Sequence, residues 1–561
     1  MSGAWLAATV LLPLALAALL AWPRALATVV RLAPLAPLPA IVLALGPAAR
    51  LDVDWILVGV RLQSGPVEAP LLLLFGVLWF AASIYAADWF RNDASARRYW
   101  LFHLLTLAAN AGVLIAGDLV SFYTCYALLT LAVYALVIHH LDPPAWRAGR
   151  VYLVMALAAE ALLVAAVLLI GAQAGNAPLV DVGDAVLAHP YRNLLTGLVI
   201  AGFAVKMGCM PLHVWLPLAH PQAPVPASAV LSGVIVKAGL VGWMRLLPLG
   251  DADMAGVGAL FIVAGLATAF TAATVGVFQA RAKGLLAYST VSQMGLLTAL
   301  VGVGLAESQL WPVLLPVVGV FALHHGLAKG ALFLACGVQS RARTLFAALP
   351  AISLAGAPLT GGALAKSESK RWIESAPGAW GDALPWLFLG SSLFTTLLMA
   401  RLLWLLATTT GSDRSGATGR LVVYILSPAA VVIPWAWAAR HAELDTGYAL
   451  STEAMLDAAW PFVIGTVIAV LTVRLMLRSR HGRQWPTVPE GDLLVLLPAR
   501  LPRIRAPAAT DRLRLMVPWE RLGTLVARGL LHTDRRHLGV GTAGALLLLT
   551  ALVLALAVAM R

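Results

Sequence analysis

Long apolar stretches recur along the whole chain, separated by short segments that carry charged, proline or glycine residues. A helix needs about 20 apolar residues to cross the hydrocarbon core of a bilayer, and about sixteen stretches reach that length. The pattern therefore predicts an all-α polytopic membrane protein. The predicted spans cover residues 4–21, 25–47, 69–89, 99–116, 118–139, 150–171, 193–210, 226–247, 255–279, 285–304, 311–338, 346–375, 383–407, 421–439, 460–478 and 541–560.

Arginines flank these spans unevenly, and their placement predicts an orientation. Every second loop is rich in arginine, as at Arg24 and Arg31, whereas alternate loops are richer in acids such as Asp181. Because basic loops tend to stay on the cytoplasmic side, we predict a bacterial inner-membrane protein with its N-terminus outside. Arg50 and Arg61 depart from this rule, since they lie on a loop assigned to the outer side.

Composition supports a membrane protein and excludes several other classes. Hydrophobic residues make up 61% of the chain and charged residues 12%, with a mean hydropathy of +0.87. The net charge of +13 is carried mainly by arginines beside the apolar runs, so we expect no nucleic-acid partner. Cys125, Cys209 and Cys336 lack the spacing of metal ligands or disulfides. With no glycine-rich nucleotide loop either, we expect neither a metal nor a cofactor.

Residues 479–540 form one long polar stretch, and it is strongly basic. It contains the short amphipathic sequence VPWERLGTLVARGLL. On the predicted orientation this segment is cytoplasmic. It would lie on the anionic headgroups of the bilayer or dock along a neighbouring subunit, and the sequence leaves both interpretations open.

Several ionisable side chains fall inside predicted spans, and seven of them are candidates for a proton pathway. A charge at bilayer depth costs about 2.5–3.5 kcal/mol on insertion scales, and such groups usually mark ion or proton routes. A snorkelling side chain at a helix end is the alternative, and it fits Lys206 better than Lys237, which has apolar residues on both sides. His325 and Lys329 are four residues apart and share one helix face. The candidate proton-pathway residues are Glu160, Lys206, Lys237, His324, His325, Lys329 and Lys366.

Two predicted spans contain residues that break helices. Proline removes a backbone donor and glycine weakens a helix, and helices interrupted at corresponding positions are typical of inverted-repeat transporters. We therefore predict two inverted five-helix repeats, each with a broken helix. The breaking residues are Pro211, just after Lys206, and Pro358, Gly361 and Gly362, just before Lys366. The predicted regions are 1–98 (N-terminal helices), 99–250 and 251–410 (repeats), 411–478 (C-terminal helices), 479–540 (basic linker) and 541–561 (terminal helix).

A dense motif surrounds the first break and continues to a second buried lysine. Its positions are Lys206, Pro211, His213, Trp215, Leu216, Pro217, Ala219, His220, Ala223, Pro224, Pro226, Ser228, Ala229 and Lys237. With LLAYSTVSQMG, the pair His325 and Lys329, and PLTGGALAK, roughly residues 70–410 resemble the antiporter-like subunits of complex I, of Mrp-type cation/proton antiporters and of membrane-bound hydrogenases. With lysine at position 237, the motif resembles most the hydrogenase and Mrp-like branch of the family.

Two positions depart from this family. The family carries a glutamate in the fifth span, two spans before the lysine, where Ala127 stands here, and Leu218 replaces the acid of its L-P-D-A-H loop. We predict that Glu160, one span later, takes over the missing role. A carboxylate within about 4–6 Å would favour the charged form of Lys206.

The resemblance implies a proton-translocating subunit of a redox-driven complex, of hydrogenase or NADH/quinone oxidoreductase type. Its other membrane subunits, with a soluble redox or uptake module, would be the partners, and this chain would have no catalytic centre of its own. Two alternatives remain. One is a subunit of an Mrp-like cation/proton antiporter or of a proton-coupled inorganic-carbon uptake system, moving protons or Na+. The other is a membrane scaffold that has lost pumping, as Ala127 would allow.

Overall fold

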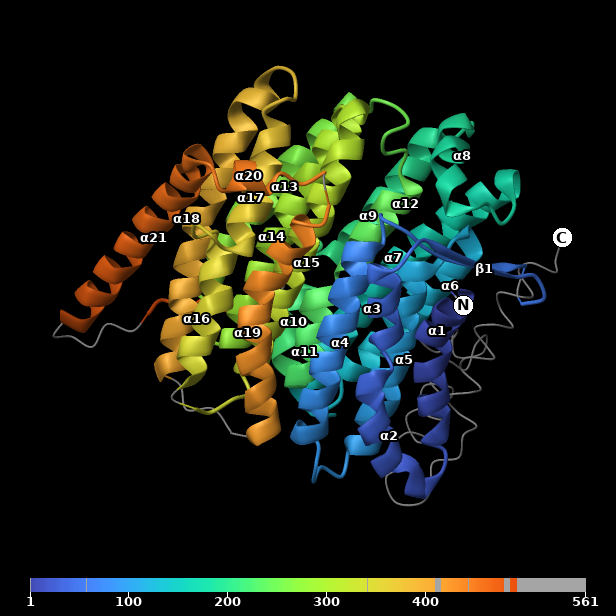
Figure 1. Ribbon diagram of the computed structural model, residues 1–561, viewed down its shortest axis with the longest axis horizontal. Coiled ribbons are helices and arrows are strands. Elements are labelled where there is room, and N and C mark those ends of the chain that lie inside the picture. The colour runs from blue at the N-terminus through green and yellow to red at the C-terminus, as the bar shows by residue number, and fades with distance from the viewer. Residues whose placement is uncertain are drawn as a thin grey trace, which may run out of the picture.

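The computed structural model describes residues 2–56, 58–340, 342–408, 415–441, 443–478 and 485–491, which form a helical bundle (Figure 1). Twelve helical segments of this described part are long and apolar enough to cross a membrane. The many-span helical architecture is therefore confirmed, whereas the count of sixteen is not reached by these criteria. The expected span 541–560 and nearly all of the linker 479–540 lie outside the described residues.

The N-terminal region begins with α1 (Ser2–Leu19) and continues in short helices in place of the single helix predicted over 25–47. Prolines explain the interruptions, because each removes a backbone donor and clashes with the preceding turn. Pro34 and Pro37 fall at the junction. The short elements are η1 (Pro23–Ala25), α2 (Leu26–Leu32), η2 (Ala33–Leu35) and α3 (Leu38–Leu45).

A β-hairpin follows, so the prediction of an all-α chain with a plain loop around Arg50 and Arg61 is wrong here. Strand β1 (Ala49–Val53) pairs antiparallel with β2 (Val60–Ser64). Polar and apolar residues alternate in both strands, which is the strand period. A search for long apolar runs does not detect such short segments.

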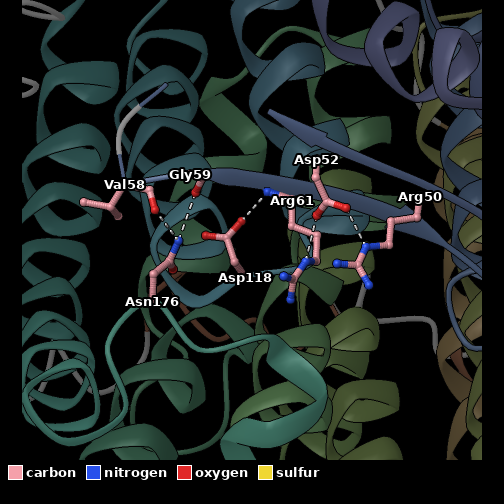
Figure 2. Close-up of polar contacts among 7 residues, drawn as sticks. All are labelled: Arg50, Asp52, Val58, Gly59, Arg61, Asp118 and Asn176. Atoms are coloured by element: carbon pink, nitrogen blue, oxygen red, sulfur yellow. Dashed lines mark hydrogen bonds and ion pairs between the residues drawn. The ribbon is translucent and has the colours of Figure 1, made fainter. Parts of the chain in front are cut away.

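Polar contacts hold this hairpin on the bundle (Figure 2). The Asp52 carboxylate accepts hydrogen bonds from Arg50 at 2.7 Å and from Arg61 at 2.9 Å. The backbone N–H of Arg61 donates to Asp118 at 2.7 Å, and the Asn176 amide donates to the Gly59 carbonyl at 2.9 Å. The hairpin is thereby attached to the ends of the helices that follow it.

The first predicted repeat follows α4 (Ala69–Trp89). The helix predicted over 193–210 runs to Met207, shortly before the predicted break at Pro211, and the one predicted over 226–247 contains a π-helical turn. The elements are α5 (Ala96–Ile115), α6 (Leu119–Val137), α7 (Pro143–Ala174), η3 (Leu179–Asp181), α8 (Val182–Ala188), α9 (Arg192–Met207), α10 (Trp215–Gln222), α11 (Val225–Val230), the π-turn η4 (Leu231–Ile235) and α12 (Lys237–Leu246).

The second predicted repeat also contains a divided span. The break predicted within the span 346–375 is present, since residues 356–360 separate two helices. The elements are α13 (Ala255–Val277), α14 (Ala282–Ala306), η5 (Ser308–Leu310), α15 (Trp311–Ala335), α16 (Ala342–Ala355), α17 (Gly361–Ile373) and α18 (Ala379–Thr408). The inverted relation between the two repeats stays a prediction.

The C-terminal part of the described chain comprises α19 (Ala417–Ala438), α20 (Thr446–Ala449) and α21 (Thr452–Arg478), and α21 runs obliquely along one side of the bundle (Figure 1). Burial is greatest in the middle of the molecule. The membrane-length window of α14 is 100% buried, against 28% in α1 and 22% in α21. The central helices can therefore carry polar side chains shielded from lipid, whereas the outer helices must expose apolar flanks to it.

Candidate functional site

Glu160 and Lys206 line one cavity between α6, α7 and α9. Lys206 is 5% exposed. Its Nζ donates to Thr130 Oγ1 at 3.1 Å and lies 5.2 Å from the centre of the Tyr126 ring. The cavity has room for about one water molecule. The carboxyl group and the amine thus share a small polar space. We call Tyr126, Thr130, Tyr152, Glu160 and Lys206 the α9 site.

The Glu160 carboxyl group makes no direct ion pair with Lys206. Neither of its oxygens has a hydrogen-bond partner in the described chain, although the hydroxyls of Thr130 and Tyr123 lie beside it. The two charges are nevertheless within electrostatic range. A bridging water, or a small movement of Glu160, would complete the contact.

The C-terminal end of α9 shapes this site. Gly208 follows the helix with a left-handed φ of 69°, a conformation that glycine adopts readily, and the chain then runs through Pro211 without helix. Trp215, at the start of α10, donates its indole N–H to the Val205 carbonyl at 2.7 Å. This bond satisfies one of the carbonyls that a helix end leaves free, and it holds the indole beside Lys206.

Lys237 and His325 make the closest contact among the candidate residues. The Nζ of Lys237 lies 2.7 Å from His325 Nδ1 and donates to the Ser232 carbonyl at 2.9 Å. Ser232 belongs to η4, and π-helical turns are frequent at functional sites. Lys329 is fully buried and donates to the Leu286 carbonyl at 3.1 Å. Three basic side chains therefore meet where α12, α14 and α15 pack.

His324 and Lys366 lie around the break between α16 and α17. The Nε2 of His324 is 2.9 Å from Ser353 Oγ, and Lys366 donates to Ser392 Oγ at 2.6 Å. His324 is within electrostatic range of both Lys366 and Lys237. We call Lys237, His324, His325, Lys329 and Lys366 the α15 site.

Glycine at the same break permits a close approach. The chain passes through Pro358 before α17 starts at Gly361. A Cβ atom at Gly362 would lie 1.8 Å from the Ser353 carbonyl oxygen, so a larger residue would push α17 away from α16. The break thus supports the position of Lys366 on α17.

The two histidines of the loop motif are fully buried. The His213 ring lies 6.0 Å from that of Tyr288. His220 stacks on Phe333 at a centroid distance of 4.5 Å, and neither of its ring nitrogens has a hydrogen-bond partner in the described chain. The Ser228 hydroxyl donates to the His220 carbonyl at 3.0 Å and links α10 to α11. No hydrogen bond between described residues joins the α9 site to the α15 site.

Sequence reasoning missed a buried arginine within the first predicted repeat. Arg245, on α12, donates to the carbonyls of Leu114 at 2.6 Å and Ala116 at 2.7 Å, at the end of α5. It also pairs with Glu68 at 3.3 Å. An arginine inside the apolar span 226–247 was the available signal, and its contacts suit a structural role.

A second missed cluster joins α17 to α21. Lys370 pairs with Asp457 at 2.5 Å and with Glu453 at 3.1 Å. Nearby, the Glu368 side chain is completely buried, and its oxygens lack hydrogen bonds in the described chain. Among the residues that the structure describes, no group of three or more His, Cys, Asp or Glu side chains could hold a metal ion.

Residues 116–369 match the family described as NADH:quinone oxidoreductase/Mrp antiporter, transmembrane region. The match covers a little under half of the chain. The matched segment contains every residue of the α9 and α15 sites. The expected resemblance is therefore confirmed.

Individual relatives come from several kinds of complex. Hydrogenase-4 component B of Escherichia coli (strain K12) is 31% identical over 295 residues, covering 50% of this chain and 44% of that protein. NAD(P)H-quinone oxidoreductase chain 4 2 of Microcystis aeruginosa (strain NIES-843 / IAM M-2473) is 32% identical over 292 residues, covering 50% of each chain. The alignments thus span about half the length of these relatives or less.

A solved structure of the Mrp complex from Dietzia sp. DQ12-45-1b contains a chain with the same fold. The TM-score is 0.65 at 21% identity, covering 83% of this chain and 99% of that one. Residues 116–369 are therefore similar to the transmembrane region of antiporter-like subunits, and the chain shares its fold with a subunit of a solved Mrp complex.

Proposed function

We propose that this chain conducts protons through the membrane as a subunit of a redox-driven complex. The hydrogen-bonded pair of Lys237 and His325, buried next to Lys329, is the observation that carries the proposal. Basic groups held this close in an apolar bundle repel each other when all are protonated. A proton that reaches one of them therefore favours release from another.

The distribution of lysine supports this role. Every lysine of the chain lies between residues 206 and 370, whereas the loops carry arginine. Lysine changes its protonation state readily when buried, while arginine stays charged. Most of the lysines thus lie in the interior, where proton exchange would occur.

In the proposed cycle, Glu160 controls the charge of Lys206. When the carboxylate approaches, Lys206 holds its proton; when it moves away or is neutralised, the proton is released. Transfer to Lys237 requires water between the two sites. From Lys237 the proton passes to His325, whose Nδ1 accepts it, then through Lys329 and His324 to Lys366 and out. Glu160 thereby acts in place of the acid missing at Ala127.

The redox partner is inferred from the relatives. Hydrogenase-4 component B and an NAD(P)H-quinone oxidoreductase chain bear names of redox complexes, and this chain would be driven by partner subunits in the same way. An Mrp-like antiporter is the second candidate, because the Dietzia structure shares the fold. The bilayer location, the inner membrane and the N-terminus outside belong to the same proposal.

The test is proton uptake by the native complex, purified through a tag on this chain and reconstituted in proteoliposomes with a pH dye. Lys237→Ala and Lys206→Ala should each abolish coupled uptake while the complex still assembles. Arg192→Ala, at the exposed opposite end of α9, is the matched control and should transport normally. Wild-type uptake in both lysine variants would refute the proposal, and the copurified subunits would distinguish a redox complex from an antiporter.

A further inference from the structure

A third polar cluster lies outside both sites, where α14 begins. The ammonium of Lys283 donates to the backbone carbonyl of Ala223, between α10 and α11. Residues 485–491, which we call the strap, pass over this place. Glu490 of the strap pairs with Arg281 and lies within electrostatic range of Lys283. A carboxylate from the far C-terminal side is thus held beside a lysine of the family segment.

The strap is anchored by several contacts. The backbone N–H of Val488 donates to the Phe278 carbonyl at 2.9 Å, and the Trp485 indole donates to the Val277 carbonyl at 3.1 Å. The guanidinium of Arg401, on α18, lies 4.5 Å from the centre of the Trp485 ring. These contacts attach the strap to the end of α13 and leave the Glu490 side chain only 14% exposed.

His220 lies between this cluster and the α15 site. Its ring is fully buried and within electrostatic range of both Lys283 and Lys329. Stacking on Phe333 fixes the plane of the ring, while both nitrogens lack hydrogen bonds in the described chain. A buried polar group without partners is unfavourable. Exchange of protons through water would give both nitrogens a role.

We propose that Lys283 and His220 form an access branch to Lys329, and that the strap closes this branch through Glu490. The branch rests on the proposed function and adds residues to it. While the strap is seated, Glu490 favours the protonated form of Lys283, since an opposite charge stabilises the ammonium, whereas burial and the charge of Arg281 oppose it. When the strap lifts, Lys283 can release its proton. Besides these groups, Arg281 and Cys336 are the charged or titratable neighbours of Lys283.

The relay balances in protons and charge. The ammonium of Lys283 gives one proton, directly or through a water, to the free nitrogen of neutral His220. The imidazolium then gives the proton on its other nitrogen to the neutral amine of Lys329. One positive charge has moved from Lys283 to Lys329, and Lys283 takes up a new proton from solvent. His220 afterwards needs only a ring flip or a return transfer to act again.

The experiment combines two substitutions in the reconstituted native complex. His220→Phe keeps a ring to stack on Phe333 but cannot relay, and should lower proton uptake about tenfold or more. Glu490→Gln removes an ion pair and should raise uptake about threefold, but only where His220 is intact. Glu307→Gln, just beyond the opposite end of α14, is the matched control and should change nothing.

The outcomes separate this branch from the proposed function. Full uptake in His220→Phe, or the same gain from Glu490→Gln with and without His220, would overturn the branch. If Lys237→Ala abolishes uptake while His220→Phe does not, the branch alone fails; if Lys237→Ala transports normally, the proposed function fails. Should His220→Phe not assemble, His220→Gln takes its place with the same expectations.

Discussion

The α9 and α15 sites bury basic groups in two different ways. At the α9 site a single lysine lies near a carboxyl group, a hydroxyl and the faces of Tyr126 and Tyr152. At the α15 site Lys237, His325 and Lys329 lie together, and none of them forms an ion pair with a described carboxylate. At the α9 site these neighbouring groups help to stabilise the charged form of Lys206. At the α15 site a charge on one basic group disfavours a charge on its neighbours.

This difference suggests that the two sites have different roles in proton transfer. A site with a movable counter-charge can hold a proton until its partner moves. A site with crowded basic groups favours passing the proton on. The α9 site would therefore act as a control element and the α15 site as a conducting element, and the contacts that support the surrounding helices differ as well. Arg245 holds the helices of the first repeat, while Lys370 ties α17 to α21.

The largest expected effect is on stability, through Arg245. Arg245→Met removes a buried guanidinium that bonds three carbonyls and pairs with Glu68. Breaking a buried pair from one side usually costs about 3–5 kcal/mol. We expect the melting temperature of the detergent-solubilised complex to fall clearly, with loss of transport through the α9 site.

Glu68→Gln is the control for this prediction. It removes the charge but leaves the carbonyl contacts of Arg245 in place, so its melting temperature should fall less. Equal losses in the two variants would show that the ion pair, and not the bonds to the end of α5, supports the first repeat.

A smaller effect should follow from Glu160→Gln. If the carboxylate controls Lys206, its loss should slow proton uptake about tenfold, the value of one pKa unit of interaction. Ala127→Glu in the Glu160→Gln background should restore part of the rate, because it returns an acid to the α6 position that the family uses. The measurement is uptake by the reconstituted complex, compared at equal amounts of assembled protein.

Asp184→Asn, at an exposed position of α8, serves as the control and should transport normally. Full activity in Glu160→Gln would remove the contrast between the two sites, and would favour a scaffold that no longer pumps.

Much of the candidate site could be predicted, because unusual residues in apolar helices are conspicuous. Lys206, Lys237 and Lys329 are obvious in hydrophobic surroundings, and Pro211 and Gly362 mark where helices would break. Contacts between helices are harder to predict, since helical periodicity shows which side of a helix is buried but not which helix packs against it. Glu160 could thus be predicted from its place one span after Ala127. The absence of a direct contact between Glu160 and Lys206 could not be predicted in this way.

The parts that sequence reasoning missed depend on short or distant segments. The π-turn η4 follows from no residue pattern, as Ser232 and Gly233 are compatible with an ordinary helix. The strap falls within the predicted basic linker, and its seven residues carry too little periodicity to predict where they pack. The hairpin was missed for the same reason: its strands are five residues each.

The smallest expected effect concerns this hairpin, which contacts the first repeat through Asp118 and Asn176. Arg50 and Arg61 hold the pKa of Asp52 below its ordinary value of 3.8. A lowered pKa in the folded state contributes stability above the unfolded pKa, and this stability is lost as the pH falls through the folded pKa. Because Asp52 is 41% exposed, solvent screening limits the contribution to less than about 1 kcal/mol.

Asp52→Asn should therefore raise hydrogen exchange of the hairpin amides at neutral pH by a few-fold, and the difference from the wild type should disappear below an Asp52 pKa that lies under 3.8. Asp54→Asn, in the same hairpin but without an ion pair to described residues, is the control and should exchange like the wild type. Proton uptake should stay normal in both variants, since the hairpin contacts the ends of α6 and α7 and touches neither site. A transport defect in Asp52→Asn alone would mean that the hairpin takes part in conduction. The contrast between the α9 and α15 sites would then include the hairpin.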